Sequence, residues 1–291
     1  MKAKTLLLSG IFLLSLVCIG FCQENEQAER PVDPNTKPKI KYRWYGIDLL
    51  DIQRGIVGQL GLELSATVQS KHIWHGFDLL DDHGVFIPAA CVRLGDTGFS
   101  GKIIGAYSLS GGHEKSDELN YAAFYTGAFL QNTRYVTNFT ANYFYYGKPH
   151  VGYAKSDTQE IGIILSWPKM LGENGLLPNY YLGRIWPTRS HSNLEGCEGF
   201  IHVLGMAYDL TVPNFGPEGR DQTFRLSGDI TYNDGFGGVK HDWSHVVLGV
   251  STNLGLGNVT VTPYLNFQIS MDDSVNKEEE LWCGVNFTYR F

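Results

Sequence analysis

Apolar and polar side chains alternate along most of this chain, and the alternation predicts β-strands. In 62–69, for example, every second residue from Leu62 to Val68 is apolar and the residues between are polar. Side chains of a strand point to opposite faces in turn, so such a run has one apolar and one polar face. Turn residues separate the runs. The predicted strands cover 62–69, 85–94, 99–109, 119–129, 135–146, 159–167, 179–187, 197–210, 223–233, 244–254, 259–269 and 281–291.

The last run has the sharpest alternation. One face carries an apolar or aromatic side chain at each alternate position from Leu281 to Phe291, and the other carries Trp282 and polar or small residues. An aromatic end suits the closing strand of an outer-membrane barrel, whose outer face meets lipid. The spacing also resembles the assembly signal of such barrels. The residues that carry it are Trp282, Gly284, Phe287, Tyr289 and Phe291.

The first 60 residues are expected to precede the barrel. A basic start and the apolar run 6–21 predict a signal peptide, residues 1–22, with cleavage after Cys22. Lipidation at Cys18 or Cys22 is the alternative. Residues 23–60 predict a periplasmic leader, polar and proline-rich at first and then a short amphipathic segment. Trp44–Asp51 is nearly repeated at Trp74–Asp81, but two copies are too few to predict a repeat architecture.

Composition fits a barrel better than a helical membrane protein. Beyond the signal peptide, no stretch of 18 consecutive apolar residues predicts a spanning helix. The chain has 34 Gly, 16 Tyr and 16 Phe, as expected for alternating strands with aromatic girdles. A net charge of −7 argues against nucleic-acid binding.

The pattern therefore predicts an all-β fold, a transmembrane antiparallel up-and-down β-barrel of about 12 strands over residues 61–291. The expected location is the cell outer membrane. If the first strand runs outward, short links such as 95–98 lie on the periplasmic side, and long polar loops such as 110–118 lie outside. Expected partners are outer-membrane lipid and lipopolysaccharide, the barrel-assembly machinery and small solutes. A soluble exported β-sandwich is the less favoured fold.

The sequence offers only weak evidence for a catalytic or metal-binding site. Outer-membrane lipid hydrolases place His and Ser two residues apart on one strand face, and no His-x-Ser occurs here. His72, His75 and His83 lie with several aspartates in one loop, but ordinary loop polarity explains them better than a metal site. Ordinary loop polarity also explains the acidic loop 272–280 better than the binding of divalent ions does. We therefore expect no enzyme activity, cofactor or metal, and we expect Cys91, Cys197 and Cys283 to be unpaired.

The barrel lumen is the remaining candidate site. Strand phase puts charged side chains of both signs on the polar faces of the predicted strands. Such a set can form ion pairs that close a narrow barrel, or can line a weakly selective pore. The predicted lumen-facing residues are Glu63, Arg93, Lys102, Glu160, Arg225, Asp229 and Arg290.

Ser70–Phe77, with Phe86–Ala89 and Gly98–Gly101 after it, resembles the opening of the TorF-type porins. That family has the pattern Ser-x-x-x-aromatic-Arg-Gly, then Pro-Ala, then Gly-Phe, and here His75 replaces the Arg. The resemblance covers about forty residues. It implies an outer-membrane porin without a catalytic residue. The function expected is passive diffusion of small solutes, and the alternative is a closed-lumen structural or surface-binding barrel.

Overall fold

The computed structural model describes most of the chain beyond residue 59. The described residues are 43–44, 47–48, 60–152, 155–171, 175–190, 192, 194–216 and 219–291. The expected signal peptide and most of the expected leader lie outside them. Within the leader, Arg43–Trp44 (β1) pairs with Ile47–Asp48 (β2) as a short antiparallel hairpin.

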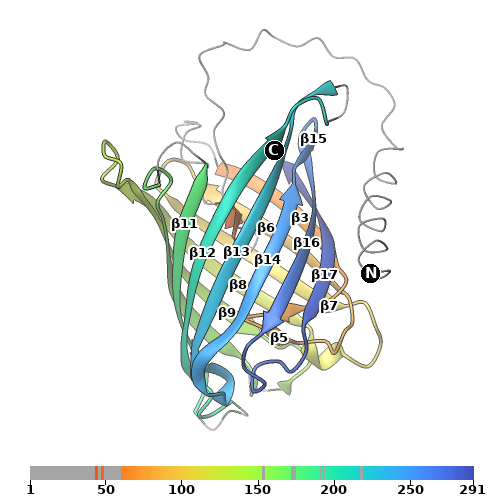
Figure 1. Ribbon diagram of the computed structural model, residues 1–291. Helices are drawn as coiled ribbons and strands as arrows, with labels where there is room; N and C mark the ends of the chain where they lie inside the picture. Colours follow the sequence, from red (N-terminus) through yellow and green to blue (C-terminus); the bar gives the residue numbers. More distant parts are fainter. Residues whose placement is uncertain are drawn as a thin grey trace, which may run out of the picture. The chain divides into compact units, whose positions relative to one another are not determined.

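Twelve antiparallel strands form a closed barrel, as the alternation predicts. Each strand pairs with its neighbours in the sequence, and the strands run obliquely around the wall (Figure 1). The barrel strands are β3 (Leu60–Gln69), β6 (Val85–Leu94), β7 (Phe99–Ser108), β8 (Glu118–Phe129), β9 (Thr137–Gly147), β10 (Thr158–Ser166), β11 (Leu176–Pro187), β12 (Gly199–Val212), β13 (Gln222–Asp234), β14 (His241–Thr252), β16 (Val259–Ser270) and β17 (Glu280–Arg290).

The barrel closes where β17 pairs with β3. Tyr289 lies opposite Leu64, and the register continues to Gly284 opposite Gln69. Both apolar faces therefore point outward together, because paired residues of neighbouring strands lie on the same side of a sheet. The closed ladder leaves no free edge, which satisfies the backbone polar groups of the wall.

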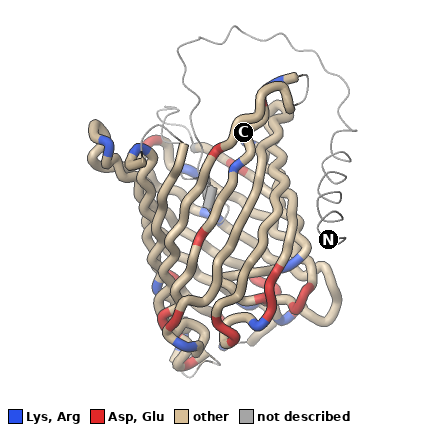
Figure 2. The backbone as a smooth tube through the Cα atoms, in the orientation of Figure 1, with Lys and Arg blue, Asp and Glu red and all other residues tan. Residues whose placement is uncertain are grey.

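The two ends of the barrel differ in their connections. The loop end carries 70–84, 109–117, 148–157, 188–198, 235–240 and 271–279. The turn end carries 95–98, 130–136, 167–175 and 253–258, the last of which includes the short strand β15 (Leu254–Leu256), and residues 213–221 link β12 to β13. Charged residues concentrate at the loop end (Figure 2). No helix in the described part of the chain is long and apolar enough to cross a membrane.

The chain divides into two compact units. The barrel belongs to the unit formed by residues 41–212 and 223–291. The second unit comprises residues 1–40 and 213–222. In its described part, the backbone N–H of Asn214 donates to the carboxylate of Asp221 at 3.1 Å, which fixes a local turn.

Pro263 would weaken the interior of a fully paired strand, since proline has no backbone N–H to donate. The structure resolves this difficulty. On one side, β16 pairs with β14 from Tyr264 onward and with β15 up to Val261, so Pro263 lies in the break between the two partners. The Thr262 hydroxyl donates to the side-chain carbonyl of Asn253 at 2.7 Å in the same break. The missing N–H therefore costs no ladder bond on that side.

Candidate functional site: a hairpin inside the barrel

The loop between β3 and β6 contains a second short hairpin, Ile73–Trp74 (β4) paired with Phe77–Asp78 (β5). Its two turn residues, His75 and Gly76, have φ of 49° and 91°. Positive φ at both central residues is typical of a two-residue hairpin turn, and glycine is the residue that adopts it without strain. The sequence predicted only a polar outer loop here.

This hairpin folds into the lumen at the loop end of the barrel. Trp74 and Phe77 pack against a buried apolar cluster. The cluster comes from the inward faces of β10, β11 and β12 and from Phe236 in the next loop. Its members are Ile164, Leu177, Tyr181, Ile185, Ile201, Val203 and Phe236. The hairpin thus reaches from the β3 wall to the opposite wall and buries apolar surface there.

The turn of the hairpin meets polar groups as well as apolar ones. His75 is only 4% exposed; its ring stacks on Tyr181, and its Nε2 lies 3.8 Å from a carboxylate oxygen of Glu160. Tyr146 donates to the same Glu160 oxygen at 2.5 Å. From β16, the Gln268 amide donates to the Gly76 carbonyl at 2.9 Å. These contacts fix the turn against three strands, because buried polar groups are costly unless bonded.

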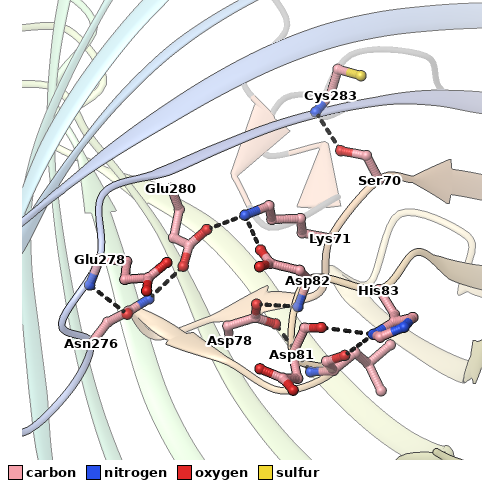
Figure 3. A network of polar contacts seen from close by, with 11 residues as sticks. Ser70, Lys71, Asp78, Asp81, Asp82, His83, Asn276, Glu278, Glu280 and Cys283 are labelled. Carbon is pink, nitrogen blue, oxygen red and sulfur yellow. Dashed lines mark hydrogen bonds and ion pairs between the residues drawn. The ribbon is translucent and has the colours of Figure 1, made fainter.

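The base of the hairpin is held by an ionic network (Figure 3). The Lys71 ammonium pairs with Asp82 and with Glu280, the latter at 2.6 Å. Asp78 accepts from the backbone N–H groups of Leu80 and Asp82. Burial disfavours the charged ammonium, but the bonds to Asp82 and Glu280 outweigh it and raise the pKa of Lys71 above its usual value. Lys71 therefore remains protonated at neutral pH and neutralises the surrounding acids.

Asp78, Asp82 and Glu280 offer carboxylate oxygens within 4.8 Å of one another, a spacing compatible with a cation. The sequence placed these acids in two separate loops, and the fold brings them together. Lys71 already supplies positive charge to two of the three. The set is therefore better explained as an ion-pair network that ties the hairpin base to β17.

The predicted lumen residues at the turn end form two ion-pair groups. Glu63 accepts from Arg93 at 3.1 Å and from Arg290 at 2.9 Å, joining β3, β6 and β17. Arg225 makes a bidentate pair with Asp209 of β12, with both distances at 2.7 Å. Paired planar groups of this kind are well oriented. Sequence reasoning omitted Asp209, although the phase of its strand puts it inward with Ala207.

The other predicted lumen residues are dispersed. Glu160 lies under the hairpin, and Lys102 lies opposite Cys91 in the β6–β7 ladder. Asp229 lies opposite Val247, and within the described residues it has no hydrogen-bond or ion-pair partner. Cys91, Cys197 and Cys283 are free. Cys91 and Cys283 are on strands as expected, whereas Cys197 lies in the loop before β12 because that strand begins at Gly199.

Space remains beside the hairpin. A cavity of about 140 Å³ lies between Trp74 and the walls of β8 to β11. Its lining includes Tyr146 and the ion pair of Glu118 with Lys148, whose atoms are 2.6 Å apart. The loop end of the lumen is thus narrowed by the hairpin. Sequence reasoning missed Glu118 and Lys148 because Glu118 is the first residue of β8 and Lys148 begins the loop after β9.

The outward face of the barrel is apolar. Large hydrophobic side chains are exposed around the wall, among them Leu64, Ile103, Tyr125, Ile161, Leu204, Leu248 and Phe287. Of the predicted assembly-signal residues, Phe287, Tyr289 and Phe291 are exposed, and the rings of the last two meet at 4.7 Å. Trp282 and Gly284 are buried on the lumen side, where a Cβ at position 284 would overlap the Tyr264 ring. Soluble proteins rarely expose so continuous an apolar surface.

Comparison with known proteins finds likeness in structure only. No family model and no curated protein matches this chain. The KdgM porin is similar with a TM-score of 0.48 at 7% identity, over 79% of this chain and 99% of that one. An outer membrane channel from Pseudomonas putida F1 gives 0.47 at 12%, over 84% and 100%. The NanC porin gives 0.46 at 8%, over 79% and 100%.

Proposed function

We propose that this chain is an outer-membrane channel in which an inward-folded hairpin narrows the lumen, and that small solutes cross it by passive diffusion. One observation carries the proposal: a closed barrel has an apolar outer face, charged side chains on its inner face and a hairpin docked on an apolar cluster at one end of its lumen. An apolar wall without free edges suits lipid. The expected TorF-type membership and the absence of catalysis belong to the same proposal.

A closed barrel with a structural or surface-binding role is the second candidate. The observation that favours it is the burial of the hairpin turn, where His75, Glu160 and Gln268 are almost inaccessible. If the hairpin never leaves the lumen and no path remains beside it, no solute crosses. The two candidates differ in one measurable property, which is conductance.

Planar-bilayer recording separates them. In the test variant, residues 72–82 are replaced by Asn-Gly, which forms a tight hairpin turn and removes the lumen segment. In the control, residues 110–115 of the β7–β8 loop are replaced in the same way, because that segment contributes no residue to the apolar cluster under the hairpin. We expect small conductance steps from the wild type and the control, and several-fold larger steps from the test variant.

If the wild type shows no conductance and the test variant conducts, the closed barrel is favoured. If all three proteins are folded, as shown by their heat-modifiable gel bands, and none conducts, the channel proposal is wrong. Location is tested separately by membrane fractionation. Recovery of the mature protein in the soluble periplasm would contradict the outer-membrane assignment.

A further inference from the structure

One basic side chain breaks the pattern of the barrel wall. Of the Lys and Arg residues in the described barrel strands, Arg93, Lys102, Arg225 and Arg290 point into the lumen. Arg184 of β11 points outward instead. Its neighbour Ile185 is fully buried in the cluster under the hairpin, so Arg184 lies on the opposite, exposed face.

Arg184 lies near the loop end of the apolar wall. It is three residues before Pro187, where β11 ends, and it pairs across the sheet with Ile161 and with Phe200, the second residue of β12. Ile161 and Phe200 are exposed to the same side. Aromatic rings gather at this level, including Trp186 and Tyr143, as in the girdles that mark a membrane interface. The position therefore corresponds to lipid headgroups and not to the bilayer centre.

No carboxylate of the described residues pairs with Arg184; its contact is the ring of Phe200, with the guanidinium carbon 5.7 Å from the ring centre. A cation over a ring uses the face of the guanidinium. The five N–H groups lie in the plane and remain available to an acceptor. Charge on a lipid-facing wall is unfavourable unless a partner neutralises it.

Further polar groups flank Arg184 on the outward face. On β10, Gln159 accepts a bond from the Tyr143 hydroxyl at 2.7 Å, and it lies opposite Trp186. On the other side, Tyr180 of β11 is bonded to His202 of β12 at 2.8 Å. We call Gln159, Arg184 and His202 the girdle patch, since Gln159 and His202 lie diagonally across the ladder from Arg184. It is a local polar site on an otherwise apolar wall.

We propose that the girdle patch binds a phosphate group carried by an outer-leaflet lipid, with Arg184 as the principal ligand. The inference rests on the proposed outer-membrane location. The phosphates of lipopolysaccharide lie at the headgroup level that Arg184 occupies. Arginine suits this partner because its planar N–H groups match two phosphate oxygens at once. The flanking amide and imidazole supply secondary contacts to the same headgroup.

Binding of lipid A to the refolded full-length protein in a nonionic detergent tests the proposal. The readouts are tryptophan fluorescence, since Trp186 adjoins the site, and the temperature at which the heat-modifiable band is lost. We expect diphosphorylated lipid A to bind the wild type, and Arg184→Gln to weaken that binding tenfold or more. Arg184→Lys should restore part of the affinity because it restores the charge but not the bidentate geometry. Arg225→Gln is the matched control, because Arg225 points into the lumen.

Equal affinity of the wild type and Arg184→Gln would overturn the proposal, as would equal binding of dephosphorylated lipid A, which would indicate acyl packing alone. Full competition by inorganic phosphate at the same concentration would show that the lipid is not the specific ligand. If Arg184→Gln does not fold, Phe200→Leu tests the same site, since it removes the ring beneath the guanidinium and should weaken binding several-fold. If the protein shows no conductance but binds lipid A as expected, the result contradicts only the proposed transport function and not the lipid site.

Discussion

At the scale of single residues, the position of the hairpin depends most on Gly76. A Cβ at this position would lie 2.6 Å from His245 Cε1 and 3.0 Å from Val275 Cγ1, and the backbone φ is 91°. Both the close approach and the left-handed backbone therefore require glycine. The carbonyl of the same residue accepts the bond from Gln268, so a shift of the turn also leaves a buried amide unpaired.

Gly76→Ala is expected to displace the hairpin from the lumen, because strain and overlap together cost roughly 1–3 kcal/mol. The hairpin should then become cleavable by protease at the loop end, and conductance steps should grow toward those of the hairpin-replacement variant. Limited proteolysis and bilayer recording measure these effects. Gly111→Ala is the control, since no atom lies within 4 Å of a Cβ there. Unchanged protection in Gly76→Ala would show that the turn tolerates a side chain.

At the scale of elements, the near-repeat forms the same structure twice. In the first copy Arg43 lies opposite Asp48 and Trp44 opposite Ile47; in the second Ile73 lies opposite Asp78 and Trp74 opposite Phe77. The shared sequence thus encodes a tight local hairpin. The local sequence does not determine where a hairpin docks, because the contact residues of the second copy, such as Glu160 and Gln268, are distant in the sequence. Local alternation carries no information about such contacts, so the sequence predicted the strands but not the lumen hairpin.

The docking of this element is expected to weaken in acid. His72 lies at the base of the hairpin, and burial lowers its pKa from 6.5; the charge of Lys148 lowers it further, whereas the charges of Glu118 and Asp78 partly oppose the shift. A released hairpin has a solvated His72 of ordinary pKa and binds a proton more readily than the docked one. Docking stability is therefore present above about pH 6.5 and is lost as the pH falls below it.

Amide hydrogen exchange of residues 72–79 checks this dependence. Between about pH 7.5 and about pH 5, protection corrected for the intrinsic exchange rate should fall in the wild type and change less in His72→Gln. Protection that rises on acidification would contradict the assigned sign.

At the scale of the whole molecule, closure of the barrel depends on the inward–outward alternation of side chains, which must agree between neighbouring strands. Because side chains alternate strictly, the outward set of every strand follows from a few clear runs, and this is why the fold and the inward direction of Arg93 or Arg225 follow from sequence. The ion-pair partners of these lumen residues do not follow from the sequence. The pairing of Arg225 with Asp209 and of Glu63 with two arginines depends on the register between strands. Register is a property of the assembled sheet.

Replacing Phe287 and Tyr289 together by Asn is expected to block assembly of the barrel. Both side chains are exposed on the closing strand, and the change places two amides on its lipid face. The folded, heat-modifiable band should fall at least several-fold in outer-membrane fractions on unboiled gels. Replacing the outward-facing Leu248 of β14 by Asn controls for polarity alone. Normal amounts of the folded double variant would show that the closing strand tolerates polar residues.

The hairpin in the lumen also sets an order of events during biogenesis. Its cross-wall bond joins Gln268 to Gly76, two residues 192 positions apart. That bond cannot form until the β16 wall exists, whereas β3 can pair with β6 much earlier. Docking of the turn is therefore completed only after β16 has joined the sheet, even though the apolar cluster from β10, β11 and β12 can receive the rings of the hairpin before that.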